Sequence, residues 1–135
     1  MLTRKASFLD MARLIDVLPE SEVVKWMDMS RDSVLHQTLV TIKNKRVIAG
    51  TLSVALPESN TAMVLSVFNV TDTPEILDYV FNKIPVYYRE DAIQIDKIVT
   101  SAHYDKLPFF QTIGFVPESC VISKMFSTEK GTGEV

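Results

Sequence analysis

The spacing of hydrophobic positions in the first third of the chain predicts a short strand followed by two helices. Residues 2–5 favour an extended strand. Apolar side chains then recur at helical spacing, in a helix that opens at Ser7 or Asp10 and ends at Pro19. A second short helix follows, with Ser21 as its candidate N-cap.

The middle of the chain changes to an extended pattern and predicts three strands. They span residues 35–42, 46–56 and 62–70, and the last is an almost continuous apolar and β-branched run that is typical of a strand covered on both faces. Gly50 interrupts the second strand, which indicates a bulge or a close approach of another backbone. Since the three segments follow one another closely, we expect an antiparallel meander.

Helical and extended segments alternate over the rest of the chain. Thr73, as an N-cap, and Pro74, in the first turn, favour a helix start, and Pro85 is expected to end that helix. A strand over 93–100 follows. A short helix from Pro108 to Thr112 stops at Gly114, and residues 115–126 supply the last strand or pair of strands. This order predicts an α+β (mixed α/β) fold, in which helices flank a mixed, mainly antiparallel sheet.

Composition narrows the classes of function without choosing one. The 135 residues suit one domain, which we place at residues 1–128, with a flexible tail at 129–135. A net charge of −3 gives the surface as a whole no attraction to nucleic acid, and no apolar run reaches the ~20 residues of a membrane span. The single cysteine excludes an internal disulfide, and with the charged N-terminus it favours a cytoplasmic protein.

Two short stretches carry a resemblance to a known family. The opening Thr3-Arg4-Lys5-Ala6-Ser7 with Asp10, and the late segment Phe109-Phe110-Gln111-Thr112-Ile113-Gly114-Phe115, resemble the GNAT superfamily, the GCN5-related N-acetyltransferases. The order of elements matches that family as well. The resemblance implies a GNAT-like fold whose sheet splays between the 62–70 and 93–100 segments, with acyl-CoA in the gap. It assigns cofactor contacts to Phe68, Val70, Thr71, Thr73 and Phe110.

The chain departs from the family at the turn that should hold the pyrophosphate. The family places a basic or amide residue and glycines there, so that bare N–H groups and a helix dipole bind the anion. Here Val70-Thr71-Asp72-Thr73-Pro74-Glu75 contains no glycine and no cation, and it adds two carboxylates. Each carboxylate near a pyrophosphate costs on the order of 1 kcal/mol. Acetyl-CoA is therefore the candidate cofactor that the fold implies and that this turn disfavours.

The chain also departs from the family at the general acid. The family often has a tyrosine directly after the first phenylalanine of the late segment, and its hydroxyl protonates the leaving thiolate. This sequence has Phe110 there, which has no proton to give. Tyr104 is the substitute candidate for the acid, and His103, just after the fifth strand, is the candidate base. A loop histidine with no catalytic role is the alternative for His103.

The other polar candidates have structural alternatives. His36 could also act as a base, but His36 and His103 lie too far apart in the sequence, without further ligands at matching spacing, to predict a metal site. The spacing of Ser101, His103 and Asp105 argues against a nucleophilic triad. Cys120 is expected to be a small core residue on the last strand.

Three surface features are candidates for contacts with other molecules. Tyr87, Tyr88 and Arg89 are expected in a loop before the fifth strand, which either binds a partner or covers the sheet edge. The Trp26 helix, with Met27 and Met29, either lines an acceptor pocket or belongs to the core or a homo-oligomer face. Arg4, Lys5 and Arg13 form a basic cluster, either a solvated helix face or a phosphate site.

Two functions remain in competition. The first is an atypical N-acetyltransferase that moves an acyl group from acyl-CoA to an amine acceptor, with N–H groups around Phe68 to Val70 polarising the thioester carbonyl. The second is a catalytically inactive GNAT-like binding or structural protein, similar to some phage-encoded proteins, that contacts a protein partner. An unrelated α+β fold, without a splay between the fourth and fifth strands, is a more distant third.

Overall fold

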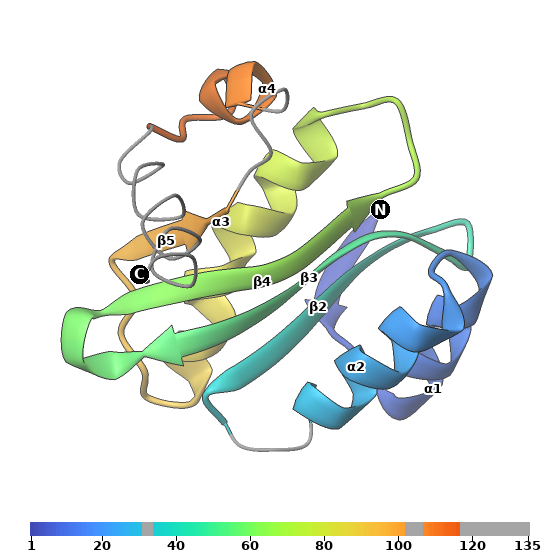
Figure 1. Cartoon of the computed structure of the whole chain (residues 1–135), viewed down its shortest axis with the longest axis horizontal. Helices are drawn as coiled ribbons and strands as arrows, with labels where there is room; N and C mark the ends of the chain where they lie inside the picture. The colour runs from blue at the N-terminus through green and yellow to red at the C-terminus, as the bar shows by residue number, and fades with distance from the viewer. Residues whose placement is uncertain (31–33, 102–106, 117–135) are drawn as a thin grey trace, which may run out of the picture. The chain divides into compact units, whose positions relative to one another are not determined.

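The structure, a computed structural model, describes residues 1–30, 34–101 and 107–116 (Figure 1). The chain divides into two compact units, residues 1–100 and 101–135, which are described separately below. Among the helices in these described ranges, none is long and apolar enough to cross a membrane. The single domain expected over 1–128 and the tail over 129–135 stay predictions.

The first unit is built on a five-stranded sheet in the order β1-β2-β3-β4-β5. Its strands are β1 (Leu2–Lys5), β2 (His36–Lys43), β3 (Arg46–Leu56), β4 (Thr61–Asn69) and β5 (Lys97–Thr100). The first four strands pair antiparallel, and β5 joins β4 in parallel. The mixed, mainly antiparallel sheet and the meander from β2 to β4 are thus confirmed.

Helices cover both faces of this sheet (Figure 1). They are α1 (Phe8–Arg13), a 3₁₀ turn at Leu14–Asp16, α2 (Glu20–Ser30) and α3 (Glu75–Glu90), and a second 3₁₀ turn spans Pro57–Ser59. Leu52 packs in the core cluster with α1 and α2, whereas the hydroxyl of the next residue, Ser53, lies 3.0 Å from that of Tyr88 on α3. Because successive strand residues point to opposite faces, α2 and α3 lie on opposite sides of the sheet.

The core beneath α1 and α2 depends on one glycine. Trp26 is fully buried, and its ring lies 5.5 Å from the ring of Phe68 on β4. A Cβ atom at Gly50 would come within 2.8 Å of both the Leu39 carbonyl oxygen and the Phe68 ring. The close approach predicted at Gly50 is confirmed, since any larger side chain there would displace Phe68. Trp26 is a core residue.

The start of α1 agrees with the sequence. Ser7 is the N-cap, its hydroxyl accepts from the Asp10 N–H at 3.1 Å, and the Asp10 carboxylate accepts from the Ser7 N–H at 2.9 Å. This reciprocal capping box satisfies two backbone donors that the helix itself leaves open. The prediction for Ser21 is wrong, because α2 already begins at Glu20 and Ser21 lies within it.

The predicted end of α3 at Pro85 is also wrong, and with it the predicted loop over Tyr87, Tyr88 and Arg89. Proline in a helix interior costs about 3 kcal/mol, yet α3 continues to Glu90. Packing beyond the proline offsets this cost. Tyr88 is fully buried, its hydroxyl donates to the Leu35 carbonyl at 2.9 Å, and the Tyr87 hydroxyl donates to the Thr3 carbonyl at 2.9 Å.

The described part of the second unit contains α4 (Leu107–Thr112). Gly114 follows with φ of 101°, the left-handed conformation in which glycine has no steric cost, and the Phe115 N–H donates to the Phe110 carbonyl at 3.0 Å. The predicted helix stop is therefore confirmed. The strand predicted over 115–126 lies, from residue 117 onward, outside the described residues.

Candidate functional site

The candidate site is the second half of β4, whose outer edge, away from β3, has no partner strand within residues 1–100. β5 pairs with β4 over four positions only, from Thr61 opposite Lys97 to Val64 opposite Thr100. β4 runs on to Asn69 and stays paired with β3 over that stretch. Within residues 1–100, the outer edge of 65–69 therefore has no partner strand, which is the splay expected between these two segments.

A β-bulge marks the point where the two strands part. Leu52 pairs with Ser66 and Ser53 with Val64, so Leu65 is an extra residue on β4. A bulge bends its strand and redirects the side chains and amides that follow it, and bulges are frequent next to active sites. The bulge thus lies between the part of β4 that binds β5 and the part that leaves its outer edge open.

The direction of one hydrogen bond shows which amides face the open edge. The Val70 N–H donates to the Ile48 carbonyl at 2.9 Å, so it points toward β3. In an antiparallel ladder, residues alternate between pointing at the partner and away from it. Phe68 therefore shares the direction of Val70, and the N–H groups of Val67 and Asn69 point to the open edge. The amides available to polarise a carbonyl are those of Val67 and Asn69. The sequence indicated N–H groups around Phe68 to Val70, and this is wrong for Phe68 and Val70, whose N–H groups point to β3.

The side chain of Phe68 is engaged in the core rather than at this edge. It lies against Trp26 and directly over Gly50. Phe68 thus fixes the position of β4 relative to α2. Trp26 is buried with it and does not line an acceptor pocket, while Met27 and Met29 pack partly buried against the same core.

The turn from β4 into α3 uses up most of its own hydrogen-bond donors. The Asn69 side-chain oxygen accepts from the Thr71 N–H at 2.9 Å and from the Thr71 hydroxyl at 2.7 Å. The Thr73 N–H donates to the Thr71 hydroxyl oxygen at 3.2 Å, and the Asn69 amide donates to the Thr73 carbonyl at 3.1 Å. Thr71 and Thr73 were expected to contact an anion. The Thr71 hydroxyl is instead bonded to Asn69, and the Thr73 N–H is bonded to Thr71.

The first turn of α3 offers an anion little more. Pro74 is its N-cap residue, with no side-chain capping bond, so the predicted cap at Thr73 is wrong. The Ile76 N–H donates to the Thr73 carbonyl at 3.3 Å and the Leu77 N–H to the Pro74 carbonyl at 3.0 Å. Helix N-termini bind anions through unpaired N–H groups. Here the amides that the turn does not use are chiefly those of Asp72 and Glu75, whose own side chains are acidic.

The predicted basic cluster of Arg4, Lys5 and Arg13 does not form as one site. Arg4 binds the buried Asp10 carboxylate with two hydrogen bonds, at 2.9 and 3.1 Å, and Lys5 pairs with Asp91 at 2.9 Å. Burial by itself would raise the pKa of Asp10, but the Arg4 bond and the bonds from Ser7 outweigh it and lower that pKa. Arg13 lies apart from both pairs, in a pocket described below.

Several candidate residues cannot be placed together with this edge. His103, Tyr104, Asp105 and Cys120 lie outside the described residues. Phe110 is buried within the second unit, and its ring meets that of Phe115 edge-on at 5.5 Å.

His36, the other histidine, begins β2, two strands away from β4. Its Nδ1 atom is buried without a hydrogen-bond partner among the described residues. In the same part of the chain, no group of three or more His, Cys, Asp or Glu side chains is arranged to hold a metal ion.

Comparison with known proteins adds to this picture through structure alone. No protein-family model matches the chain, and no curated protein matches its sequence. The apo aminoglycoside 6'-N-acetyltransferase AAC(6')-IG from Acinetobacter haemolyticus is similar in structure, with a TM-score of 0.69, 10% identity and coverage of 88% of this chain and 93% of that one.

Two further solved structures are similar to the same extent. Aminoglycoside N-acetyltransferase AAC(6')-Iy in complex with CoA has a TM-score of 0.68 at 5% identity, covering 86% of this chain and 92% of that one. Ribosomal-protein-alanine N-acetyltransferase from Brucella melitensis biovar Abortus 2308 has a TM-score of 0.67 at 12% identity, covering 87% and 94%. The chain therefore has the GNAT fold, which confirms the resemblance at the level of the fold.

Proposed function

We propose that this chain is an atypical N-acyltransferase, which moves an acyl group from an acyl-CoA thioester to an amine. The observation that carries the proposal is the open edge of β4 beyond Val64, with the bulge at Leu65 and two outward N–H groups. A sheet edge inside a fold is normally paired or covered, and an extended ligand with amide groups can take the place of the missing strand. The pantetheine arm of coenzyme A has this chemistry, and one of the similar structures is a CoA complex.

The transfer needs a neutral amine and a polarised carbonyl. The amine nitrogen attacks the thioester carbon, and the tetrahedral oxyanion accepts a hydrogen bond from the outward N–H of Val67 or Asn69. Collapse of this intermediate forms the amide and breaks the C–S bond. The amine loses a proton to a base, and the departing thiolate gains one from an acid, so that the products are the amide and free coenzyme A.

The base and the acid are proposed as His103 and Tyr104. Imidazole titrates near neutral pH, and a tyrosine hydroxyl can supply the proton that Phe110 lacks. The substitution His103→Ala should lower kcat and shift the pH profile. Tyr104→Phe should slow transfer from thioesters with a poor leaving group more than from those with a good one.

Coenzyme binding is expected to be weak. The turn formed by Asn69, Thr71 and Thr73 engages the Thr71 N–H, the Thr71 hydroxyl and the Thr73 N–H in its own hydrogen bonds, and the carboxylates of Asp72 and Glu75 repel a pyrophosphate. We therefore expect a Kd for acetyl-CoA of about 0.1 mM or weaker. Affinity then depends on the pantetheine along β4 and on the contact proposed for Val70.

The substitution Val67→Pro tests the proposal. It removes an N–H that points to the open edge and should leave the ladder to β3 intact, because proline is tolerated where its missing donor faces no strand. Val67→Ala is the matched control, since it changes the same side chain and keeps the N–H. With both variants shown to be folded by circular dichroism, we expect release of free thiol from acetyl-CoA, with polyamine or peptide amines, to fall at least about tenfold for Val67→Pro alone. Equal rates for the two variants would contradict the role of the edge.

A catalytically inactive GNAT-like binding protein is the second candidate. The self-satisfied turn around Asn69 and the phenylalanine at position 110 both favour it. Calorimetry with saturating acetyl-CoA distinguishes the two functions. Neither heat nor a thermal shift would support the inactive protein, whereas turnover of acetyl-CoA with an amine would exclude it.

A further inference from the structure

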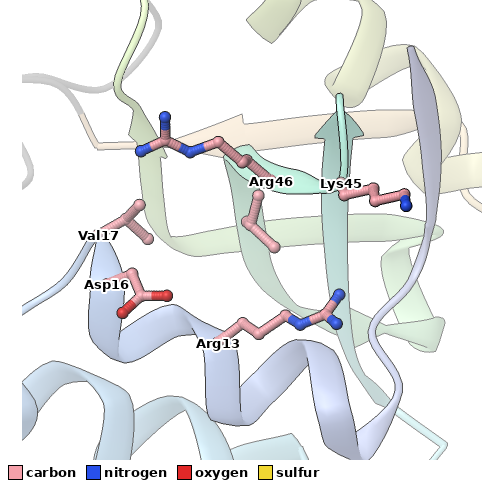
Figure 2. Close-up of a pocket in the computed structure, with 6 residues that line it drawn as sticks. Arg13, Asp16, Val17, Lys45 and Arg46 are labelled. Carbon is pink, nitrogen blue, oxygen red and sulfur yellow. The ribbon is translucent and has the colours of Figure 1, made fainter.

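A basic pocket lies at the same end of the sheet as the turn from β4 into α3. It has a volume of about 220 Å³ and is lined by Arg13, Asp16, Val17, Lys45, Arg46 and Val47 (Figure 2). We call Arg13, Lys45 and Arg46 the pocket cations. The Val70 N–H donates to the carbonyl of Ile48, which lies two residues after Arg46. The end of β4 and the start of β3 therefore lie at the same end of the sheet as the pocket.

The charge of the pocket is not neutralised by its surroundings. Three cationic side chains face one carboxylate, that of Asp16. Within the described ranges, no ion pair or side-chain hydrogen bond joins any of these four groups to another residue, whereas Arg4 and Lys5 both have carboxylate partners. A chain with a net charge of −3 thus gathers unpaired positive charge at one concave place. Concave sites with low-dielectric walls concentrate their field and attract counter-ions.

The backbone holds one of the pocket cations at a steric cost. The tight turn between β2 and β3 places Asn44 at φ of 53° and Lys45 at φ of 65°. Two-residue hairpin turns of this kind favour glycine at the second position. A lysine there costs on the order of 1 kcal/mol, and strain of this kind is found most often at functional sites.

The pocket cations come from two elements and surround the pocket rather than meet at one point. In Figure 2, Arg13 extends from the helical side, beside Asp16 and Val17, while Lys45, in the turn, and Arg46, the first residue of β3, extend in opposite directions. A ligand with more than one anionic group can contact several of them at once. At about 30 Å³ per water molecule, the pocket has room for about seven waters, which is enough for a diphosphate.

We propose that this pocket binds the diphosphate group of a small molecule. Each arginine guanidinium can donate two parallel hydrogen bonds to phosphate oxygens, and lysine adds a point charge. Two arginines and a lysine therefore match a diphosphate better than they match a ligand with a single carboxylate. The diphosphate can belong to a coenzyme or to a nucleotide. This proposal does not depend on acyl transfer. It places the diphosphate in the pocket at the Lys45 turn and not at the Thr71 turn, where the family resemblance implies a pyrophosphate.

The test uses the full chain and inorganic pyrophosphate, followed by amide NMR. Saturable shifts are expected at Arg13, Lys45 and Arg46, and not at residues 71–75. The double variant Arg13→Gln/Arg46→Gln should weaken binding by about tenfold or more, and added salt should weaken it further. Lys43→Gln is the matched control, because Lys43 is exposed at the end of β2 and lies outside the pocket lining. It should change the affinity by less than about twofold.

The source of the diphosphate follows from two more titrations. ADP and coenzyme A are compared with pyrophosphate on the same amides, and tighter binding of either one identifies its class. The absence of any saturable shift at the pocket amides, or equal weakening by Lys43→Gln, would overturn the proposal. Neither result bears on acyl transfer, which is measured separately by thiol release from acetyl-CoA.

Discussion

Two groups of cations show how differently the same side chains are used within one fold. On β1, Arg4 is bound to the buried Asp10 and Lys5 to Asp91, so their charge serves the fold. In the pocket, near the end of β2 and the start of β3, the pocket cations form no ion pair with any described residue, and Asp16 is the one carboxylate among the residues that line the pocket. The sequence grouped Arg13 with Arg4 and Lys5, whereas the structure places it with Lys45 and Arg46. A basic residue is therefore available for a ligand only where the fold leaves it without a partner.

The largest contrast is expected from removing a carboxylate in each group. Asp10→Ala should lower the free energy of unfolding by about 2–3 kcal/mol, because it removes the carboxylate that accepts from the Ser7 N–H and leaves Arg4 without its partner. Asp16→Ala in the pocket should change it by less than about 0.5 kcal/mol. Urea denaturation measures both values. Equal losses for the two variants would show that the division into paired and unpaired charges is wrong.

Lowering the pH should reproduce part of the destabilisation expected for Asp10→Ala. The folded state lowers the pKa of Asp10 below the value of about 3.9 that an unfolded chain has. The stabilisation is therefore complete above that value and is lost as the pH falls through the lowered pKa. The difference in unfolding free energy between the wild type and Asp10→Asn should shrink from neutral pH to below about pH 4. A difference that stays constant over this range would contradict the pairing.

A substitution in the turn around Asn69 should have an intermediate effect on the free energy of unfolding. Asn69→Ala removes the acceptor of two Thr71 donors and one bond to the Thr73 carbonyl, and it should cost about 1 kcal/mol because water replaces part of these bonds. Asn82→Ala, at an exposed helix position with one long hydrogen bond of 3.4 Å, is the control and should be neutral or slightly stabilising. Thermal unfolding of both variants measures the difference, and no loss for Asn69→Ala would mean that the turn is not held by this side chain.

The smallest expected change in stability is an increase, whereas the substitutions above lower stability. Lys45→Gly relieves a positive φ of 65° and should stabilise the chain by about 0.5–1 kcal/mol while it weakens pyrophosphate binding. Lys43→Gly, two residues earlier at the end of β2, should instead destabilise the chain by a similar amount. If Lys45→Gly raised the midpoint of unfolding without any loss of affinity, the strained lysine would have no part in the anion site.

The sequence predicted the sheet well because its strands are bounded by local signals. The segment 46–56 matches β3 at both ends, and Gly114 ends α4 as expected. The course of α3 beyond Pro85 could not be predicted, because the burial of Tyr88 against β3 is tertiary packing that outweighs a local breaker. The partner of Lys5 was equally hidden, since Asp91 lies 86 positions away.

The candidate site was predicted only in outline. The splay beyond β4 followed from the family resemblance, and it agrees with the end of pairing at Val64. The bulge at Leu65 could not be predicted, and it changes which amides face the open edge. Asn69 was not singled out either, although an asparagine two residues before Thr71 has the spacing of a turn closed by an asparagine side chain. The pocket was missed because its residues come from separate parts of the chain.

Hydrogen exchange of four neighbouring amides tests the central claim about β4 most directly. In the free protein, the N–H groups of Val67 and Asn69 should exchange quickly, while those of Phe68 and Val70, which point to β3, should be protected. Saturating acetyl-CoA should slow exchange at Val67 and Asn69 and leave the other two unchanged. Fast exchange at Val67 and Asn69 in the presence of bound acetyl-CoA would contradict the proposal that the open edge holds the acyl donor.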